Sequence, residues 1–230
     1  MNEKRTIASQ LEERVRRDII SGRLKPGSKM RLRELSVHYD AGVIPLREAL
    51  SRLAMTGFVS AVDQKGFSVQ RISAPELRDV TRTRLHIECR ALALSIENAD
   101  IEWESQLVAA HHRMGRHEMR TPQTHQLNAD WEEAHEAFHA ALLANCGSPW
   151  LLRFVDTLCD QTLRYRALAA ASPVGEGRDI ALEHRQLMEA ALARDVTRAT
   201  MLLTEHYMRT MAIVLESDAL AIQDTQKAGA

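Results

Sequence analysis

Apolar residues in the first third of the chain recur at helical spacing over three short stretches. The stretches 8–21, 31–39 and 45–55 each place an apolar stripe on one face, which predicts three short amphipathic helices. Two runs rich in β-branched and aromatic residues follow, 58–62 and 66–72, and the tight turn between them favours a hairpin. Three helices followed by a β-hairpin are typical of a winged helix-turn-helix domain.

From Ser73 onward the pattern shows only helical periodicity. Ser73-Ala-Pro-Glu76 is a capping box with proline in the first turn. Six helices are predicted after it: 75–98, 101–118, 124–145, 149–171, 179–194 and 195–216. Helices joined by short connections pack as an antiparallel bundle. The predicted fold is therefore mainly α, with a winged helix-turn-helix domain over residues 1–72, an all-helical domain over 73–216 and a frayed tail over 217–230.

The 230 residues carry a formal net charge of −1, but the charge is unevenly distributed. Residues 1–72 contain 14 Lys and Arg against 8 Asp and Glu, a balance of +6, whereas residues 73–230 contain 16 against 23, a balance of −7. A basic first domain and an acidic second domain indicate that only the first meets a polyanion.

The apolar runs and the cysteines bear on membrane insertion and on the redox environment of the protein. No stretch approaches ~18 uninterrupted apolar residues, so we expect no transmembrane helix and no membrane partner. The three cysteines lack Cys-x-x-Cys spacing, which favours reduced thiols in a cytoplasmic protein.

Basic side chains of the first domain are candidates for DNA contacts. In the third helix an inward apolar stripe leaves Arg47 and Arg52 facing outward, and Arg47 lies near the end that enters the major groove in helix-turn-helix proteins. We expect Arg31 and Arg33 to face a phosphate strand, and Lys65 at the hairpin tip to reach the backbone or the minor groove. Each of these residues alone could be a solvated surface charge. Together they indicate a DNA-reading module.

Nine of the ten histidines lie in the second domain. His135 and His139 are four residues apart and share a helical face, while His184 and His206 lie on otherwise apolar faces of two later helices. A single histidine on an apolar face is usually a hydrogen-bonded core residue. Four of them from three helices each need a buried partner, and one divalent transition metal ion would satisfy all four imidazoles.

The segment His135-Glu-Ala-Phe-His139 also matches the H-E-x-x-H pattern of zinc peptidases, in which Glu136 would act as the general base. The glycine and third histidine of the metzincin extension are absent from Ala140-Ala-Leu-Leu-Ala144. A metal-dependent hydrolase is therefore an alternative that requires turnover dependent on Glu136.

The first 72 residues contain a series of specific motifs: Leu24-Lys-Pro-Gly27, Leu32-Arg-Glu-Leu35, Pro45-Leu-Arg-Glu-Ala-Leu50, Arg52-Leu53, Gly57 and Gly66-Phe-Ser-Val69. Together they resemble the GntR family of bacterial transcription regulators. The resemblance implies a homodimer on a near-palindromic DNA operator, with Arg33 and Arg47 at DNA-contacting positions and Lys65 in the wing. The family's usual Ser-Arg-Thr before the proline is Gly42-Val43-Ile44 here, so base reading should depend more on Arg47.

The second domain carries its own motifs: Arg84-Leu-His-Ile-Glu88, Phe138-His139, Glu183-His184, Ala191-Leu-Ala-Arg-Asp195 and, in the last helix, His206. Residues 75–215 resemble the FCD ligand-binding domain of FadR-type GntR regulators. Many such domains hold zinc or nickel through an aspartate and three histidines, and the metal helps to bind a small carboxylate effector. The resemblance places His135 at the aspartate position. The donor set is then neutral, which favours Zn²⁺ or Ni²⁺ over Mg²⁺ or Mn²⁺.

The FCD resemblance also implies an effector-binding role for Arg84, whose guanidinium suits bidentate contact with a carboxylate. The alternative is an ion pair between Arg84 and Glu88 within one helix. Arg164 and Tyr165 are further candidates for the same cavity. Several stretches are similar to the glutarate-responsive group of this family, among them Gln64-Lys-Gly66, Glu102-Trp-Glu104 and Cys146-Gly-Ser148. This similarity implies a dicarboxylate effector.

These observations lead us to expect a homodimeric, metal-containing transcription regulator, a repressor released from its operator by a small carboxylate, and not an enzyme. A metal-only sensor, in which the metal ion itself is the effector, is a second alternative.

Overall fold

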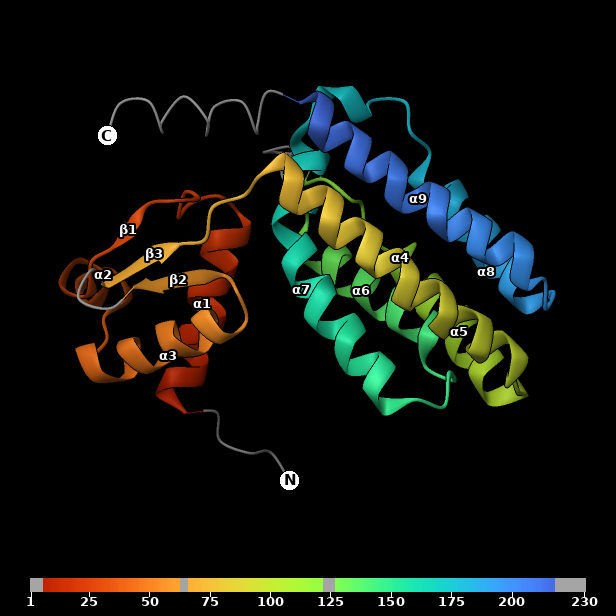
Figure 1. Cartoon of the computed structure of the whole chain (residues 1–230), viewed down its shortest axis with the longest axis horizontal. Coiled ribbons are helices and arrows are strands. Elements are labelled where there is room, and N and C mark those ends of the chain that lie inside the picture. The colour runs from red at the N-terminus through yellow and green to blue at the C-terminus, as the bar shows by residue number, and fades with distance from the viewer. Residues whose placement is uncertain (1–5, 63–65, 122–126, 218–230) are drawn as a thin grey trace. The chain divides into compact units, whose positions relative to one another are not determined.

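A computed structural model describes residues 6–62, 66–121 and 127–217, and Figure 1 shows its helices and strands. Residues up to Ser73 belong to one compact unit, and a second compact unit begins at Ala74. Lys65 and the predicted tail beyond Ser217 lie outside the described residues.

The first unit combines helices with a small sheet (Figure 1). Its elements are α1 Ile7–Ile20, β1 Lys29–Met30, α2 Leu32–Tyr39, α3 Val43–Met55, β2 Val59–Val62 and β3 Gly66–Val69. The helix α1 begins where Thr6 Oγ1 accepts a hydrogen bond of 3.1 Å from the backbone N–H of Ser9. A buried apolar stripe on α1 packs against the buried leucines of α3. This arrangement is the predicted winged helix-turn-helix.

The sheet of this unit is antiparallel, with strand order β1–β3–β2 among the described residues. Lys29 pairs with Ser68, and Val59 pairs with Val69. The sequence predicted only the hairpin that corresponds to β2 and β3. It gave no indication of β1, because a strand of two residues is too short to show an alternating pattern. Gly27 makes the turn before β1 at φ +77°, a conformation that favours glycine, and its backbone N–H donates to the Val69 carbonyl at 2.9 Å.

A short turn joins α2 to α3. Asp40 ends α2 in the left-handed conformation at φ 49°, which lets the chain reverse direction. The helix α3 begins at Val43, two residues before the predicted start at Pro45, because Gly42 takes the extended N-cap conformation. Gly42 has no side chain to accept an N–H, so the first turn of α3 lacks a side-chain cap.

The second unit is a helical bundle that also contains a 3₁₀ turn, η1, at Pro173–Gly175. Its helices are α4 Ala74–Glu97, α5 Ile101–Met114, α6 Ala129–Leu143, α7 Pro149–Ala171, α8 Ile180–Leu192 and α9 Val196–Glu216. Side chains of Asp100, Ser148, Asp179 and Asp195 accept backbone N–H groups at the starts of α5, α7, α8 and α9. The helices α4, α7 and α9 pack together, α5 packs against α6, and α8 contacts both α5 and α9.

Two boundaries in the bundle differ from the predicted ones by four or five residues, and the others agree within two. The helix α6 begins at Ala129 and not at 124, because the side chain of Asn128 caps it by accepting the backbone N–H of Asp130. The helix α5 ends at Met114 and not at 118, and Gly115 is its C-cap.

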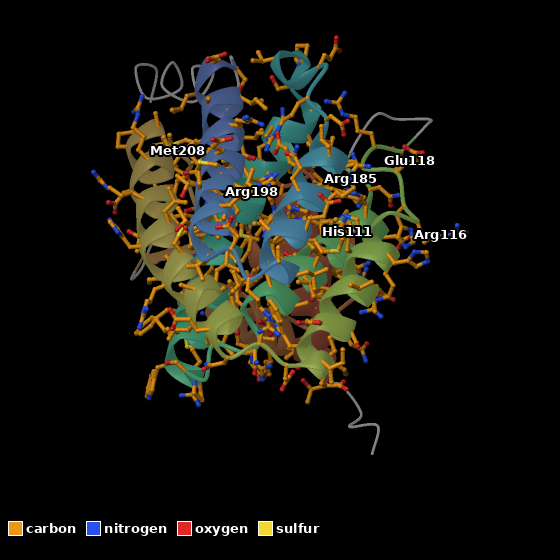
Figure 2. The ribbon with its side chains drawn as sticks, turned by 90° about the vertical axis from the view of Figure 1, so that its right-hand side faces the viewer. His111, Arg116, Glu118, Arg185, Arg198 and Met208 are labelled. Atoms are coloured by element: carbon orange, nitrogen blue, oxygen red, sulfur yellow. The ribbon has the colours of Figure 1, made fainter. Side chains whose placement is uncertain are left out.

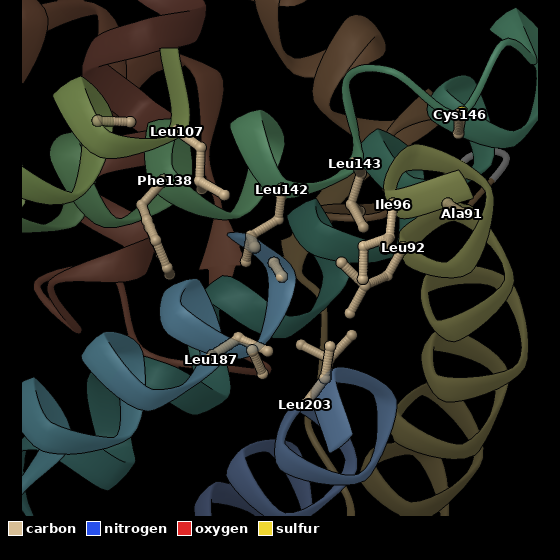
Figure 3. Packing of buried hydrophobic residues seen from close by; sticks show 14 of the residues in the cluster. Ala91, Leu92, Ile96, Leu107, Phe138, Leu142, Leu143, Cys146, Leu187 and Leu203 are labelled. Carbon is tan, nitrogen blue, oxygen red and sulfur yellow. The ribbon is translucent and has the colours of Figure 1, made fainter. Parts of the chain in front are cut away.

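The bundle core consists of apolar side chains contributed by α4 to α9. Figure 3 shows Leu107 of α5, Phe138 and Leu142 of α6, Leu187 of α8 and Leu203 of α9 turned toward one another. Each is at most 1% exposed, and burial of a side chain of this size contributes about 1.5–3 kcal/mol. This packing holds α6, α8 and α9 in fixed register, and those three helices carry the predicted metal ligands.

Within the described ranges, no helix combines the length and apolar character needed to cross a membrane. Cys89, Cys146 and Cys159 form no disulfide bonds with one another.

Candidate metal centre and nucleic-acid interface

Four buried histidines meet inside the second unit. His135 and His139 lie on α6, His184 on α8 and His206 on α9, and one potential ligand atom from each lies within 4.8 Å of the others. Nε2 of His135 is 3.1 Å from Nε2 of His139. Each residue is less than a tenth exposed, so bulk water has little access to the rings. The structure thus brings together all four residues that were predicted as metal ligands.

Core packing determines where these rings point. The four-residue spacing places His135 and His139 on one face of α6. Trp131, one turn earlier, stacks on the His135 ring with 4.6 Å between ring centroids. Phe138 is fully buried, and its ring centroid lies 5.3 Å from that of His184. Because α6 is anchored through these aromatic contacts, its two histidines are held toward α8 and α9.

The environment keeps the imidazoles neutral. Burial lowers the pKa of all four histidines, and for His135 and His139 the neighbouring imidazoles lower the pKa further. Among the described residues, Nδ1 of His135 and Nε2 of His184 are buried without a hydrogen-bond partner. An unpaired buried nitrogen is costly, and a neutral imidazole nitrogen is a good metal ligand. This donor set therefore fits a divalent transition metal ion.

Glu183 orients the fourth histidine. Its Oε2 lies 2.8 Å from Nδ1 of His206, which leaves Nε2 of that ring to face the cluster. Arg178 donates to both carboxylate oxygens, at 2.9 and 2.7 Å, and Arg209 donates at 2.9 Å. Burial raises the pKa of Glu183, but the hydrogen bonds from His206 and the two arginines outweigh it and hold the pKa far below its usual range. The result is a permanent carboxylate behind His206.

Sequence reasoning missed this supporting role. Glu183 stands beside His184 in the chain, but the contact that it makes reaches across to α9. Arg178 lies in the loop before α8, where no periodic pattern indicates which way a side chain points.

Arg84 belongs to a buried hydrogen-bond network in the bundle. Its Nε donates to Oε1 of Glu88 at 2.6 Å, Nη1 donates to Thr162 at 2.9 Å, and Nη2 donates to the Tyr207 hydroxyl at 2.9 Å. The Tyr207 hydroxyl in turn lies 3.3 Å from Nδ1 of His139. The ion pair with Glu88, the alternative considered for Arg84, is therefore present, and the network extends to the histidine cluster.

Arg164 and Tyr165 connect α7 to the start of α4. The Tyr165 hydroxyl donates to Glu76 Oε2 at 2.5 Å, and Nη2 of Arg164 lies 3.6 Å from Glu76 Oε1. Both α7 side chains are buried. Tyr165 also lines a cavity together with Arg84, whereas the contacts of Arg164 tie two helices together.

Two cavities adjoin the cluster. One, with about 420 Å³ of empty space that includes open solvent, is lined by Arg84, Tyr165 and Tyr207. The other, with about 510 Å³ that likewise includes open solvent, is lined by Arg120, Trp131 and Arg178. The residues common to both linings are His135, Arg166, His206 and Thr210. His135 and His206 of the cluster therefore lie where the two cavities meet.

Three of the candidate DNA contacts in the first unit are exposed, whereas Arg52 is only partly exposed. Arg33 and Arg47 are exposed on α2 and α3, and Arg31 is exposed while paired with Glu34 at 2.9 Å. A groove with about 660 Å³ of empty space lies between the cations Lys29, Arg31 and Arg47. Three basic side chains around one concave surface fit a phosphate backbone.

Arg52 is partly buried and contacts neighbouring polar side chains. Its Nη2 donates to Glu48 at 2.6 Å, and its Nη1 donates to Ser9 on α1 at 3.1 Å. Nη1 also lies 3.6 Å from Glu12, so Arg52 connects α3 to α1. Helical periodicity alone could not reveal these cross-helix partners.

Comparison with known proteins identifies the family. The chain matches the profile "Bacterial regulatory proteins, gntR family" over residues 7–69 and the profile "FCD domain" over residues 79–209. It is 37% identical to the HTH-type transcriptional regulator BphR of Paraburkholderia xenovorans (strain LB400), over 91% of this chain and 86% of that relative. This chain belongs to the GntR family. It is a transcription regulator with an N-terminal helix-turn-helix domain and a C-terminal FCD domain.

Two further comparisons agree with this family assignment. It is 35% identical to the HTH-type transcriptional repressor GlaR of Escherichia coli (strain K12), over 89% of this chain and 94% of that relative. Its fold matches the structure of E. coli McbR/YncC with a TM-score of 0.73, covering 92% of this chain and 98% of the other at 20% identity.

The hydrolase alternative is wrong. The relatives are transcription regulators, so the GntR-family regulator is not an enzyme. Glu136, which would act as the general base of such a hydrolase, is instead engaged in an ion pair with Arg166 at 3.0 Å.

The GntR-family regulator carries another histidine near the cluster. His111 on α5 lies close to Arg185 of α8 in Figure 2, and its ring centroid is 5.6 Å from that of Phe138. Burial lowers the pKa of His111, and Arg185 lowers it further. His111 thus packs against Phe138, the aromatic residue that supports the cluster.

Proposed function

We propose that this GntR-family regulator is a repressor whose affinity for its DNA operator is controlled by a small carboxylate bound at a metal ion in the FCD domain. The observation that carries the proposal is the convergence of His135, His139, His184 and His206 in one buried cluster. Neutral nitrogen donors are typical ligands of Zn²⁺ and Ni²⁺, and we propose one of these as the resident ion. Such an ion supplies a Lewis-acidic centre that attracts a carboxylate oxygen.

The cavity around the cluster supports an anionic effector. The Nε atoms of Arg120 and Arg166 are buried without a hydrogen-bond partner among the described residues, and both arginines line the second cavity. An anion there would satisfy donors that are now unpaired. A dicarboxylate fits two cavities that meet at the histidines, with one carboxylate at the metal and the other beside Arg120.

Arg84, Arg164 and Tyr165, the effector-binding candidates from the sequence, have different roles in this proposal. Tyr165 and Arg84 line the first cavity, where they would shape the space available to a ligand. The charge of Arg84 is already balanced by Glu88, so we propose that Arg84 positions Tyr207 and His139. Arg164 pairs with Glu76 and would hold α7 in place.

On the DNA side, Arg47 is the proposed base-reading residue, and Arg31 and Arg33 are the proposed phosphate contacts. Their exposure at the surface of α2 and α3 supports these roles. We further propose a homodimer, because a pair of half-sites needs two winged helices. Trp150 and Phe154 on α7 are 66% and 52% exposed, and such a large exposed aromatic pair fits a surface that a second copy covers.

Control of DNA binding would follow from a shift between two arrangements of the bundle. Effector and metal favour one arrangement, and the operator favours the other. A coupling of about 1–3 kcal/mol lowers operator affinity by roughly 5–150-fold, which is enough for regulation.

Metal content and operator binding test this function together. Full-length protein purified without a His-tag should contain close to one equivalent of zinc or nickel. A His139→Ala variant should lose most of it, whereas the control His86→Ala, which changes an exposed histidine of α4, should keep it. With metal present, saturating dicarboxylate should weaken operator binding of the parent and leave that of His139→Ala unchanged.

Two results would contradict parts of the proposal. Less than about a tenth of an equivalent of metal, not restored by added Zn²⁺ or Ni²⁺, removes the metal site. If metal alone shifts operator binding and carboxylates have no effect, the protein is a metal-only sensor.

A further inference from the structure

The first turn of α3 exposes a large apolar side chain. Ile44 is 84% exposed, whereas Leu46, Ala49, Leu50 and Leu53 of the same helix are buried. Val43 and Met55, the end residues of α3, are exposed as well, at 41% and 82%. An exposed isoleucine contributes almost nothing to the hydrophobic stabilisation of the fold. Its branched side chain also lowers helix propensity slightly relative to alanine. The fold therefore offers no reason for isoleucine at this position.

The neighbours of Ile44 belong to the proposed DNA-reading surface. Arg47 follows three residues later and is exposed on the same face of the helix. Arg47 also lines the groove that contains Lys29 and Arg31. The N-cap residue Gly42 has no side chain, and the first turn of α3 carries no side-chain cap. Ile44 is thus a strongly exposed apolar side chain in the first turn of α3.

Chemistry limits what such a side chain can contact on a DNA duplex. Phosphates and sugars are bound through donors and charges, and isoleucine has neither. Base edges in the major groove present donors and acceptors, and the one apolar group among them is the C5-methyl of thymine. An aliphatic side chain at the end of a helix that enters the major groove can therefore distinguish thymine from the other bases.

We propose that Ile44 contacts the C5-methyl group of a thymine in each operator half-site and so makes this regulator select thymine at that position. The inference rests on the proposed DNA-reading role of α3 and adds to it a residue and a base. Arg47 would select its base through hydrogen bonds, and Ile44 would select the neighbouring thymine through apolar contact alone.

The test removes one methyl group at a time. The operator is first isolated by selecting random duplexes with the full-length protein, and each thymine is then replaced by deoxyuridine, which lacks only the C5-methyl. At one position of each half-site the replacement should weaken binding by about fourfold, the value expected for one buried methyl-sized group. The Ile44→Ala variant should bind the thymine and deoxyuridine duplexes equally. Because Ile44 is exposed, this variant should fold like the parent, which circular dichroism checks.

Ile101→Ala is the matched control. Ile101 is also an isoleucine in the first turn of a helix, and it is 77% exposed, but it belongs to α5 of the bundle. This variant should keep the full deoxyuridine effect. A specifically bound operator that is insensitive to deoxyuridine at every thymine would overturn the thymine contact alone, as would an unchanged deoxyuridine effect in Ile44→Ala. Failure to select any preferred duplex would overturn it together with the proposed function.

Discussion

The carboxylate of Glu183 and the imidazole of His206 face each other across α8 and α9, with Oε2 of the first 2.8 Å from Nδ1 of the second. A carboxylate at this ring nitrogen fixes the tautomer, so that Nε2 of His206 carries the lone pair that a metal ion needs. Arg178 and Arg209 hold the carboxylate in place from the other side.

Glu183→Gln should lower metal affinity by roughly 10–100-fold, because the amide orients and polarises the ring less well. Competition with a chromophoric zinc chelator measures this change. The control is Glu205→Gln, which removes a carboxylate that also pairs with Arg209 but lies outside the cluster. Equal metal affinity in the two variants would show that Glu183 does not position His206.

Arg84 and Glu88 form a buried pair, and removing one member leaves the other charged and unpaired. Arg84→Met should therefore destabilise the bundle by about 3–5 kcal/mol, and adding Glu88→Leu should recover most of that loss. Urea denaturation of the full chain measures both steps. No recovery in the double variant would indicate that Arg84 stabilises the bundle mainly through Thr162 and Tyr207.

Arg47 and Arg52 stand five residues apart on α3 but have different surroundings. Arg47→Ala should lose about 1–3 kcal/mol of specific operator binding, with little change in binding to random DNA. Arg52→Ala breaks surface contacts with Glu48 and Ser9, so we expect a loss of folding stability below about 1 kcal/mol and no change in sequence preference. Fluorescence anisotropy with operator and random duplexes separates the two. A loss of specificity in Arg52→Ala would place this arginine on the DNA.

Tyr39 donates a hydrogen bond of 2.7 Å to the Asp18 carboxylate inside the first unit. Burial raises the pKa of Tyr39, and the hydrogen bond to Asp18 raises it further. A raised pKa stabilises the fold below the ordinary tyrosine pKa of about 10, and this contribution declines as the pH rises above that value. Tyr39→Phe should thus cost about 1.5–3 kcal/mol at pH 8, and the difference from the parent should shrink toward pH 11. Denaturant titrations at several pH values measure it, and a constant difference would contradict the assignment.

Trp150 and Phe154 should be covered in the proposed dimer. Trp150→Glu would place a charge in that contact and is expected to convert the dimer into monomer in analytical ultracentrifugation. The control Ile101→Glu adds the same charge at another exposed apolar position, and it should remain dimeric. If the parent is itself a monomer, the dimer proposal fails.

The sequence was sufficient for those features that depend on local periodicity. The predicted helix 149–171 coincides with α7, and the four-residue spacing of His135 and His139 correctly placed both on one face. Contacts between elements were not accessible in this way. The partners of Arg52 on α1 and the bond from Glu183 to His206 depend on how helices cross, and β1 is too short to show alternation.

A metal site made only of imidazoles, as proposed for the four-histidine cluster, has an electrical consequence. A divalent ion bound by uncharged nitrogens keeps its double positive charge in a dry interior, which is unfavourable until a counter-ion arrives. A bound dianion would offset that charge, so the metal-loaded protein should hold a dicarboxylate more tightly than the metal-free protein does.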